Sequence, residues 1–263
     1  MDIFDNENEI IAHFQNVQSS EVLLIPENDA QCDHVFAAIN TPEQWKLWID
    51  SSGKGDPPPD YYSTEHHLMM DVMRVDDHGY IGRNGRSIVN PTLERESKVM
   101  QELKEKGVFE AFPNAKPILC VDTQLPTKED HNYCYYRDSF IRTVETHKKK
   151  ISKYKLNHPE HDVIFFIFDE SSPYMETTQK QEQFTVGEIV AGQPHFWFYD
   201  ETFISAIAFS EIDYVVWYTP YKHCDLFRGG ERFELPKAAI IRVRDNIIPT
   251  FHYNEELMES AEV

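Results

Sequence analysis

The sequence contains few cysteines, a minority of basic residues and no long apolar run. Its four cysteines, Cys32, Cys120, Cys134 and Cys224, are scattered along 263 residues without CxxC spacing, which argues against a secreted disulfide scaffold. No segment approaches the roughly 18 apolar residues of a membrane span. The acidic start MDIFDNENEI also lacks the basic and then apolar order of a signal peptide. We therefore expect a cytoplasmic protein with free thiols and no membrane partner.

The charge balance restricts the way in which the chain can meet nucleic acid. With 25 Lys and Arg against 45 Asp and Glu, the net charge is -20, which opposes loose adhesion to phosphate. Residues 137–155, RDSFIRTVETHKKKISKYK, reverse the sign locally. They predict either a solvated helix face or a local nucleic-acid surface. The candidate contacts on that surface are Arg137, Arg142, Lys148, Lys149 and Lys153.

The order of apolar patterns predicts an α/β fold with a central mixed sheet flanked by helices. Helical spacing of apolar residues or helix-capping signals predict helices over residues 3–15, 33–49, 91–106, 138–156 and 201–209. Extended patterns cover residues 21–27, 65–75, 117–122, 162–171, 213–220 and 237–243. No repeat or linker interrupts them, so we expect one domain over residues 1–252 and a flexible acidic tail over residues 253–263.

The stretch DPPPDYYSTEHHLMMDVMRVDD, residues 56–77, contains two acids in unusual places. Asp60 follows three prolines, and Asp71 lies in the middle of a mostly apolar strand. A buried carboxylate is costly unless a partner compensates it, and a metal ion is one such partner. Because Mg²⁺ prefers a few carboxylates together with water, the pair predicts a site for Mg²⁺ or Mn²⁺.

Pro59-Asp60, followed after ten residues by Asp71-Val72-Met73, resembles the PD-(D/E)XK nuclease family. The resemblance implies a restriction-endonuclease-like core and phosphodiesterase chemistry on nucleic acid, with Asp60 and Asp71 as catalytic metal ligands. The family places a lysine where this chain has Met73, so we expect the activity to be weakened or lost. A basic group such as Arg74 or Lys149 would have to supply the missing charge.

Other interpretations of these residues stay open. Glu43, in the first turn of a helix, is the candidate for a third catalytic acid, although an acid there also favours the helix dipole. Asp60 could instead end a proline turn, with Asp71 paired to Arg74 or to a basic group elsewhere. A rival phosphoryl-type hydrolase site is Asp169 with Glu170, which follow a buried strand. The alternative outside enzymes is an acidic regulatory protein that binds a basic protein partner or imitates nucleic acid.

Overall fold

The structure is a computed structural model. It describes residues 6–52, 59–77, 80–81, 88–89, 91–112, 131–178, 192–222, 226–228, 231–233 and 235–260. None of the helices in these ranges is long and apolar enough to cross a membrane. The strand expected over residues 117–122 lies outside the described residues.

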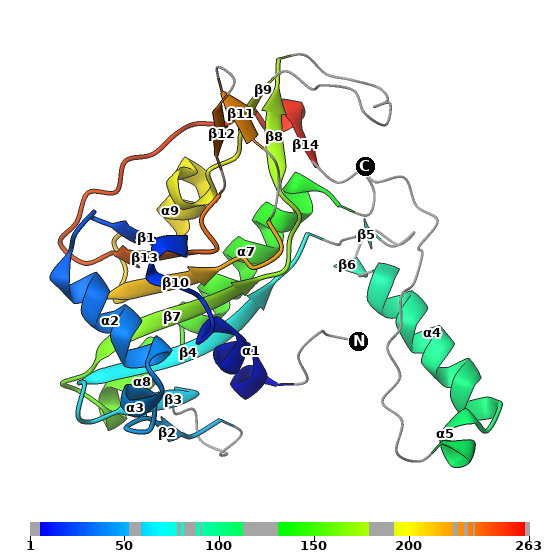
Figure 1. Ribbon diagram of the computed structural model, residues 1–263, viewed down its shortest axis with the longest axis horizontal. Coiled ribbons are helices and arrows are strands. Elements are labelled where there is room, and N and C mark those ends of the chain that lie inside the picture. Colours follow the sequence, from blue (N-terminus) through cyan, green and yellow to red (C-terminus); the bar gives the residue numbers. More distant parts are fainter. Residues whose placement is uncertain are drawn as a thin grey trace.

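A seven-stranded mixed sheet forms the centre of the fold, in the order β1-β13-β10-β7-β4-β3-β2 (Figure 1). β4, β7 and β10 are mutually parallel, and β1 is parallel to β13. The other neighbouring strands are antiparallel. The predicted α/β class with a central mixed sheet is therefore confirmed. The strands are β1 (Val22–Ile25), β2 (Ile49–Asp50), β3 (Tyr61–Ser63), β4 (Leu68–Val75), β7 (Asp162–Asp169), β10 (Tyr214–Tyr218) and β13 (Ala238–Arg242).

Helices cover both faces of this sheet, because the central strands are apolar on both sides. One face packs against α1 (Glu7–Phe14), α2 (Ala30–Asn40) and α3 (Pro42–Trp45). The other packs against α7 (Tyr133–Lys148), α8 (Ile151–Asn157) and α9 (Glu201–Ile207). Along β4, odd-numbered residues such as Met69 and Met73 face α7, while Met70 and Val72 face the opposite core. Asp71 therefore points to the α7 side.

Shorter elements surround the main sheet. α4 (Pro91–Glu105) and α5 (Val108–Ala111) lie to one side of it in Figure 1. Among the described residues, η1 (Ser19–Glu21), η2 (Trp197–Tyr199) and η3 (Glu255–Leu257) are short 3₁₀ helices. Small antiparallel sheets join β5 (Tyr80–Ile81) with β6 (Ile88–Val89), β11 (Leu226–Arg228) with β12 (Glu231–Phe233), and β8 (Tyr174–Thr177) with β9 (Gly192–Pro194) and β14 (Met258–Ser260).

Three segments differ from their expected form. The helix expected over residues 33–49 starts earlier and divides at Thr41, because Pro42 begins a new short helix and cannot continue the old one. The helix expected over 138–156 starts at Tyr133, where the Asn132 side chain accepts backbone hydrogen bonds, and it is divided between α7 and α8. Within residues 253–263, expected as a flexible tail, β14 instead pairs with β8 and Met258 is buried.

Candidate functional site

Asp60 and Asp71 meet across the β3–β4 hairpin. Tyr61 pairs with Met70 in the antiparallel register, which places the two acids next to each other at the following position. Their carboxyl groups share a hydrogen bond. Asp71 is only 3% exposed, whereas Asp60 is partly exposed and opens the pair to solvent. The two acids singled out by sequence are therefore brought together at one place.

The two carboxyl groups respond to this environment in opposite ways. Burial and the neighbouring charge of Asp71 raise the pKa of Asp60 to about 8, while the amide of Val72 donates to Asp60 Oδ2 at 2.7 Å and works against the rise. Burial also acts to raise the pKa of Asp71, but its hydrogen bonds hold that pKa below the usual value. Near neutral pH the pair therefore retains one proton, held on Asp60.

His147 and Tyr154 complete this arrangement from the helices above the sheet. His147 Nδ1 lies 2.5 Å from Asp71 Oδ2, and the Tyr154 hydroxyl donates to the same oxygen at 2.9 Å. Lys150 Nζ lies 3.5 Å from His147 Nδ1, which brings an ammonium group near the acids. Asp71 is thus partnered by α7 and α8 and not by Arg74, which pairs with Glu170 at 3.6 Å.

Sequence reasoning missed His147, although its spacing gives a signal. Phe140, Val144, Ile151 and Tyr154 form one apolar stripe, and His147 fills the gap between Val144 and Ile151 in the same rhythm of threes and fours. A titratable residue on the stripe that faces a sheet must find a polar partner there. Met73, at the position of the family lysine, is 3% exposed and packs in the core on this same face.

Glu43 does not join the pair in the way expected. Its side chain is exposed on the first turn of α3. The further acid that acts on Asp60 is Glu7, in the first turn of α1, whose charge adds to the rise of the Asp60 pKa. Among the described residues, no group of three or more His, Cys, Asp or Glu side chains could hold a metal ion. Within the described part of the chain, the pair therefore offers an ion two carboxylates, and water or a substrate would supply its other ligands.

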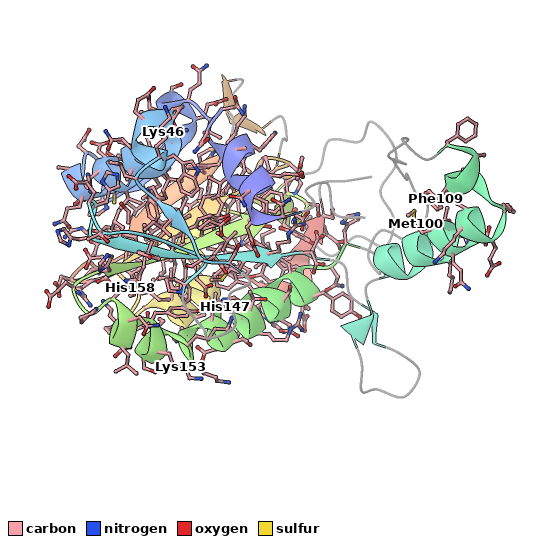
Figure 2. The ribbon with its side chains drawn as sticks, turned by 90° about the horizontal axis from the view of Figure 1, so that it is seen from below. Lys46, Met100, Phe109, His147, Lys153 and His158 are labelled. Carbon is pink, nitrogen blue, oxygen red and sulfur yellow. The ribbon has the colours of Figure 1, made fainter. Side chains whose placement is uncertain are left out.

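The expected basic surface divides into paired and exposed residues. Arg137 forms ion pairs with Asp138 and Glu255, and Lys148 bonds to Glu145 at 2.7 Å. Arg142, Lys149 and Lys153 are exposed. Figure 2 shows His147 and Lys153 on the α7–α8 side of the molecule, with Lys46 on the opposite side. The exposed cations Arg142, Lys149 and Lys153 thus belong to the α7–α8 segment, whose helices cover the face of the sheet to which Asp71 points.

The rival acids Asp169 and Glu170 point to opposite faces of the sheet. Glu170 pairs with Arg74 beside the α2 core. Asp169 is fully buried on the α7 side, where Oδ1 accepts from Ser171. Asp169 Oδ2 accepts from the Tyr136 hydroxyl at 2.5 Å, from Trp217 Nε1 at 2.9 Å and from Lys222 Nζ at 3.2 Å. Every acceptor position of Asp169 is thus taken by protein donors, which leaves little capacity for a ligand.

Comparisons of the chain with protein-family models, with curated proteins and with solved structures gave no significant match. The class of protein is therefore defined by its fold, a helix-flanked mixed α/β sheet, and by one partly exposed carboxylate pair. Function has to be inferred from the geometry of that pair.

Proposed function

We propose that the protein is a nuclease-like phosphodiesterase that binds Mg²⁺ or Mn²⁺ between Asp60 and Asp71 and acts on nucleic acid. The observation that carries the proposal is the adjacency of two carboxyl groups across the β3–β4 hairpin, with Asp71 buried and Asp60 partly open to solvent. A divalent cation can replace the proton that the pair retains and neutralise both charges. Two carboxylates with the remaining positions left to water and substrate phosphate are the donor set that Mg²⁺ commonly uses.

Once bound, a divalent cation would polarise a phosphoryl oxygen and lower the pKa of water. The chain's own groups have defined tasks. Asp60 releases its proton and orients its carboxylate through the Val72 amide. His147 and Tyr154 fix the position of Asp71. Lys150, 3.5 Å from His147, supplies positive charge on this side in place of the lysine that Met73 replaces.

Mn²⁺ titration by calorimetry tests the carboxylate pair. We expect saturable binding with release of about one proton per ion below pH 8, because Asp60 must ionise to coordinate. Repeating the titration in two buffers of different ionisation enthalpy measures that proton. Asp60→Asn and Asp71→Asn should lose binding, and cleavage of single- and double-stranded DNA and RNA should be lost with it. Glu43→Gln, altered at an exposed acid, is the matched control.

Two results would contradict this function. One is the absence of Mg²⁺ and Mn²⁺ binding even with a phosphorothioate oligonucleotide present, which would supply the missing phosphate ligands. The other is unchanged binding in both aspartate variants. Binding without cleavage would instead identify a metal-dependent nucleic-acid binder whose catalysis was lost with the lysine.

The basic surface makes a separate prediction about affinity. Replacing Arg142, Lys149 and Lys153 by alanine in an Asp71→Asn background, which prevents cleavage, should weaken binding of a labelled single-stranded oligonucleotide. The slope of log affinity against log salt should fall by about 2, since each lost phosphate contact removes about 0.7. Anisotropy titrations at several salt concentrations measure it. Arg137→Ala with Lys148→Ala is the control, because both cations already have protein partners. An equal effect of the two sets would contradict a directed surface.

A further inference from the structure

One edge of the main sheet is open at β1. β1 pairs with β13 on one side, and among the described strands none pairs with its other side. The Glu21 carbonyl accepts from the Lys237 amide, so the backbone groups of Leu23 and Ile25 also point toward β13. Those of Leu24, together with the Val22 carbonyl, point outward, while the Val22 amide bonds to Ser19. An extended chain would find both a donor and acceptors along this edge.

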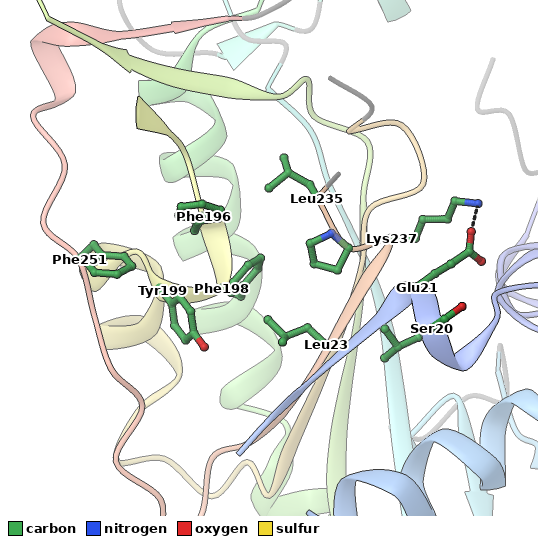
Figure 3. Close-up of a pocket in the computed structure, with 11 residues that line it drawn as sticks. Ser20, Glu21, Leu23, Phe196, Phe198, Tyr199, Leu235, Lys237 and Phe251 are labelled. Carbon is green, nitrogen blue, oxygen red and sulfur yellow. Dashed lines mark ion pairs between the residues drawn. The ribbon is translucent and has the colours of Figure 1, made fainter. Parts of the chain in front are cut away.

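A pocket of about 570 Å³ lies on the α9 side of this edge. Figure 3 shows the rings of Phe196, Phe198 and Tyr199 gathered on one side of it, with Phe251 beyond them. Leu23 and the Lys237–Glu21 ion pair lie on the other side. Phe251 is 50% exposed, and its segment pairs with Asp200 and not with β1. The pocket is therefore an aromatic-lined space directly beside unpaired backbone.

A smaller pocket of about 290 Å³ lies on the α2 side of the same strand, lined by Leu24 and Phe36. Its rim carries Glu27 and Asp33, both exposed, and neither has an ion-pair partner among the described residues. A Lys or Arg side chain suits this rim, because its stem can lie on Phe36 while its charge meets the acids. The two pockets thus favour different side chains on the two faces of an added strand, apolar or aromatic on the α9 side and basic on the α2 side.

We propose that β1 binds an extended segment of a protein partner in which apolar or aromatic residues alternate with Lys or Arg. Successive side chains of an added strand point to opposite faces, so alternate residues would enter the two pockets while the backbone pairs with Leu24. Charge favours such a partner over a second copy of the chain, since two copies of net charge -20 repel each other. The site is independent of the carboxylate pair.

A labelled peptide of alternating Phe and Lys tests the groove by fluorescence anisotropy. We expect saturable binding, and loss of it when the peptide amides that face β1 are N-methylated but not when the alternate amides are. A peptide of equal composition with Phe and Lys in two separate blocks should not bind. Phe251→Ala and Asp33→Lys should each weaken binding about tenfold. Phe209→Ala, at a fully exposed ring that lines neither pocket, should leave it unchanged.

A charge-reversal experiment tests the role of the two acids separately. Glu27→Lys with Asp33→Lys should reject the Lys peptide and accept one in which Glu replaces each Lys. Three results would each contradict strand addition at β1. They are equal binding of the alternating and block peptides, no saturable binding up to about 1 mM, and binding that is insensitive to N-methylation. Sedimentation that showed a dimer lost on Phe251→Ala would also overturn the proposal, in favour of a second copy as the occupant.

Discussion

Lys222→Met is expected to lower the free energy of unfolding by about 3–5 kcal/mol. The Lys222 side chain is 1% exposed, and its ammonium group lies 3.2 Å from Asp169 and 2.6 Å from Ser171 Oγ. It also lies 4.2 Å from the centre of the Tyr136 ring. Methionine fills a similar volume but leaves the Asp169 carboxylate buried without its cation. Urea unfolding followed by fluorescence measures the loss.

A double-mutant cycle separates the ion pair from simple packing. Asp169→Asn alone leaves the Lys222 ammonium buried without a counter-ion, whereas the double variant removes both charges. The double variant should therefore be more stable than the sum of the single effects predicts, by about 1–3 kcal/mol. Lys237→Met is the control. It removes a surface ion pair in which Lys237 Nζ lies 2.5 Å from Glu21 Oε1, and it should lower the free energy of unfolding by about 1 kcal/mol or less. Simple additivity of the two core substitutions would contradict the coupling.

Strands of the main sheet were predictable from the sequence where a segment carries a single clear apolar pattern. The run DVIFFIFD has apolar side chains on both faces, and it forms β7 between two parallel neighbours. β3 and β2 escaped prediction because they are three and two residues long, too short to show a period. β14 escaped because its pairing with β8 joins segments about 80 residues apart, and no local pattern encodes such a contact.

The carboxylate pair was predictable for a different reason. The alternation of side chains along β4 determines the face to which Asp71 points. The short connection between β3 and β4 then places Asp60 opposite Asp71 on the neighbouring strand. The third partner was not predictable from spacing near the motif, because His147 lies 76 residues along the chain. The family pattern directed attention to position 73, where the buried Met73 leaves no charge. The cation that lies 3.5 Å from His147 is Lys150, between α7 and α8, whereas the sequence had suggested Arg74 or Lys149.

The stability of the fold should fall as pH rises from about 4 to about 8, through Asp60. The folded state keeps a proton on Asp60 up to a pKa of about 8, whereas the unfolded chain releases it near the usual value of 3.8. Between these values the folded state binds more protons, so raising the pH favours unfolding. The effect should reach on the order of 2 kcal/mol, less than the full shift implies because Asp60 is partly exposed to solvent.

Comparison of variants isolates this contribution from that of His158 and His161, whose burial lowers their pKa values and acts in the opposite direction. Asp60→Asn should remove the Asp60 part of the slope and gain on the order of 2 kcal/mol relative to wild type at about pH 8. Asp71→Asn should reduce the slope without abolishing it, because burial contributes more to the shift than the Asp71 charge does. Urea unfolding midpoints across the pH range measure the stability of the wild type and of both variants. A wild-type slope that persists in Asp60→Asn would show that the retained proton lies elsewhere, and a cation at the pair would then release no proton from Asp60.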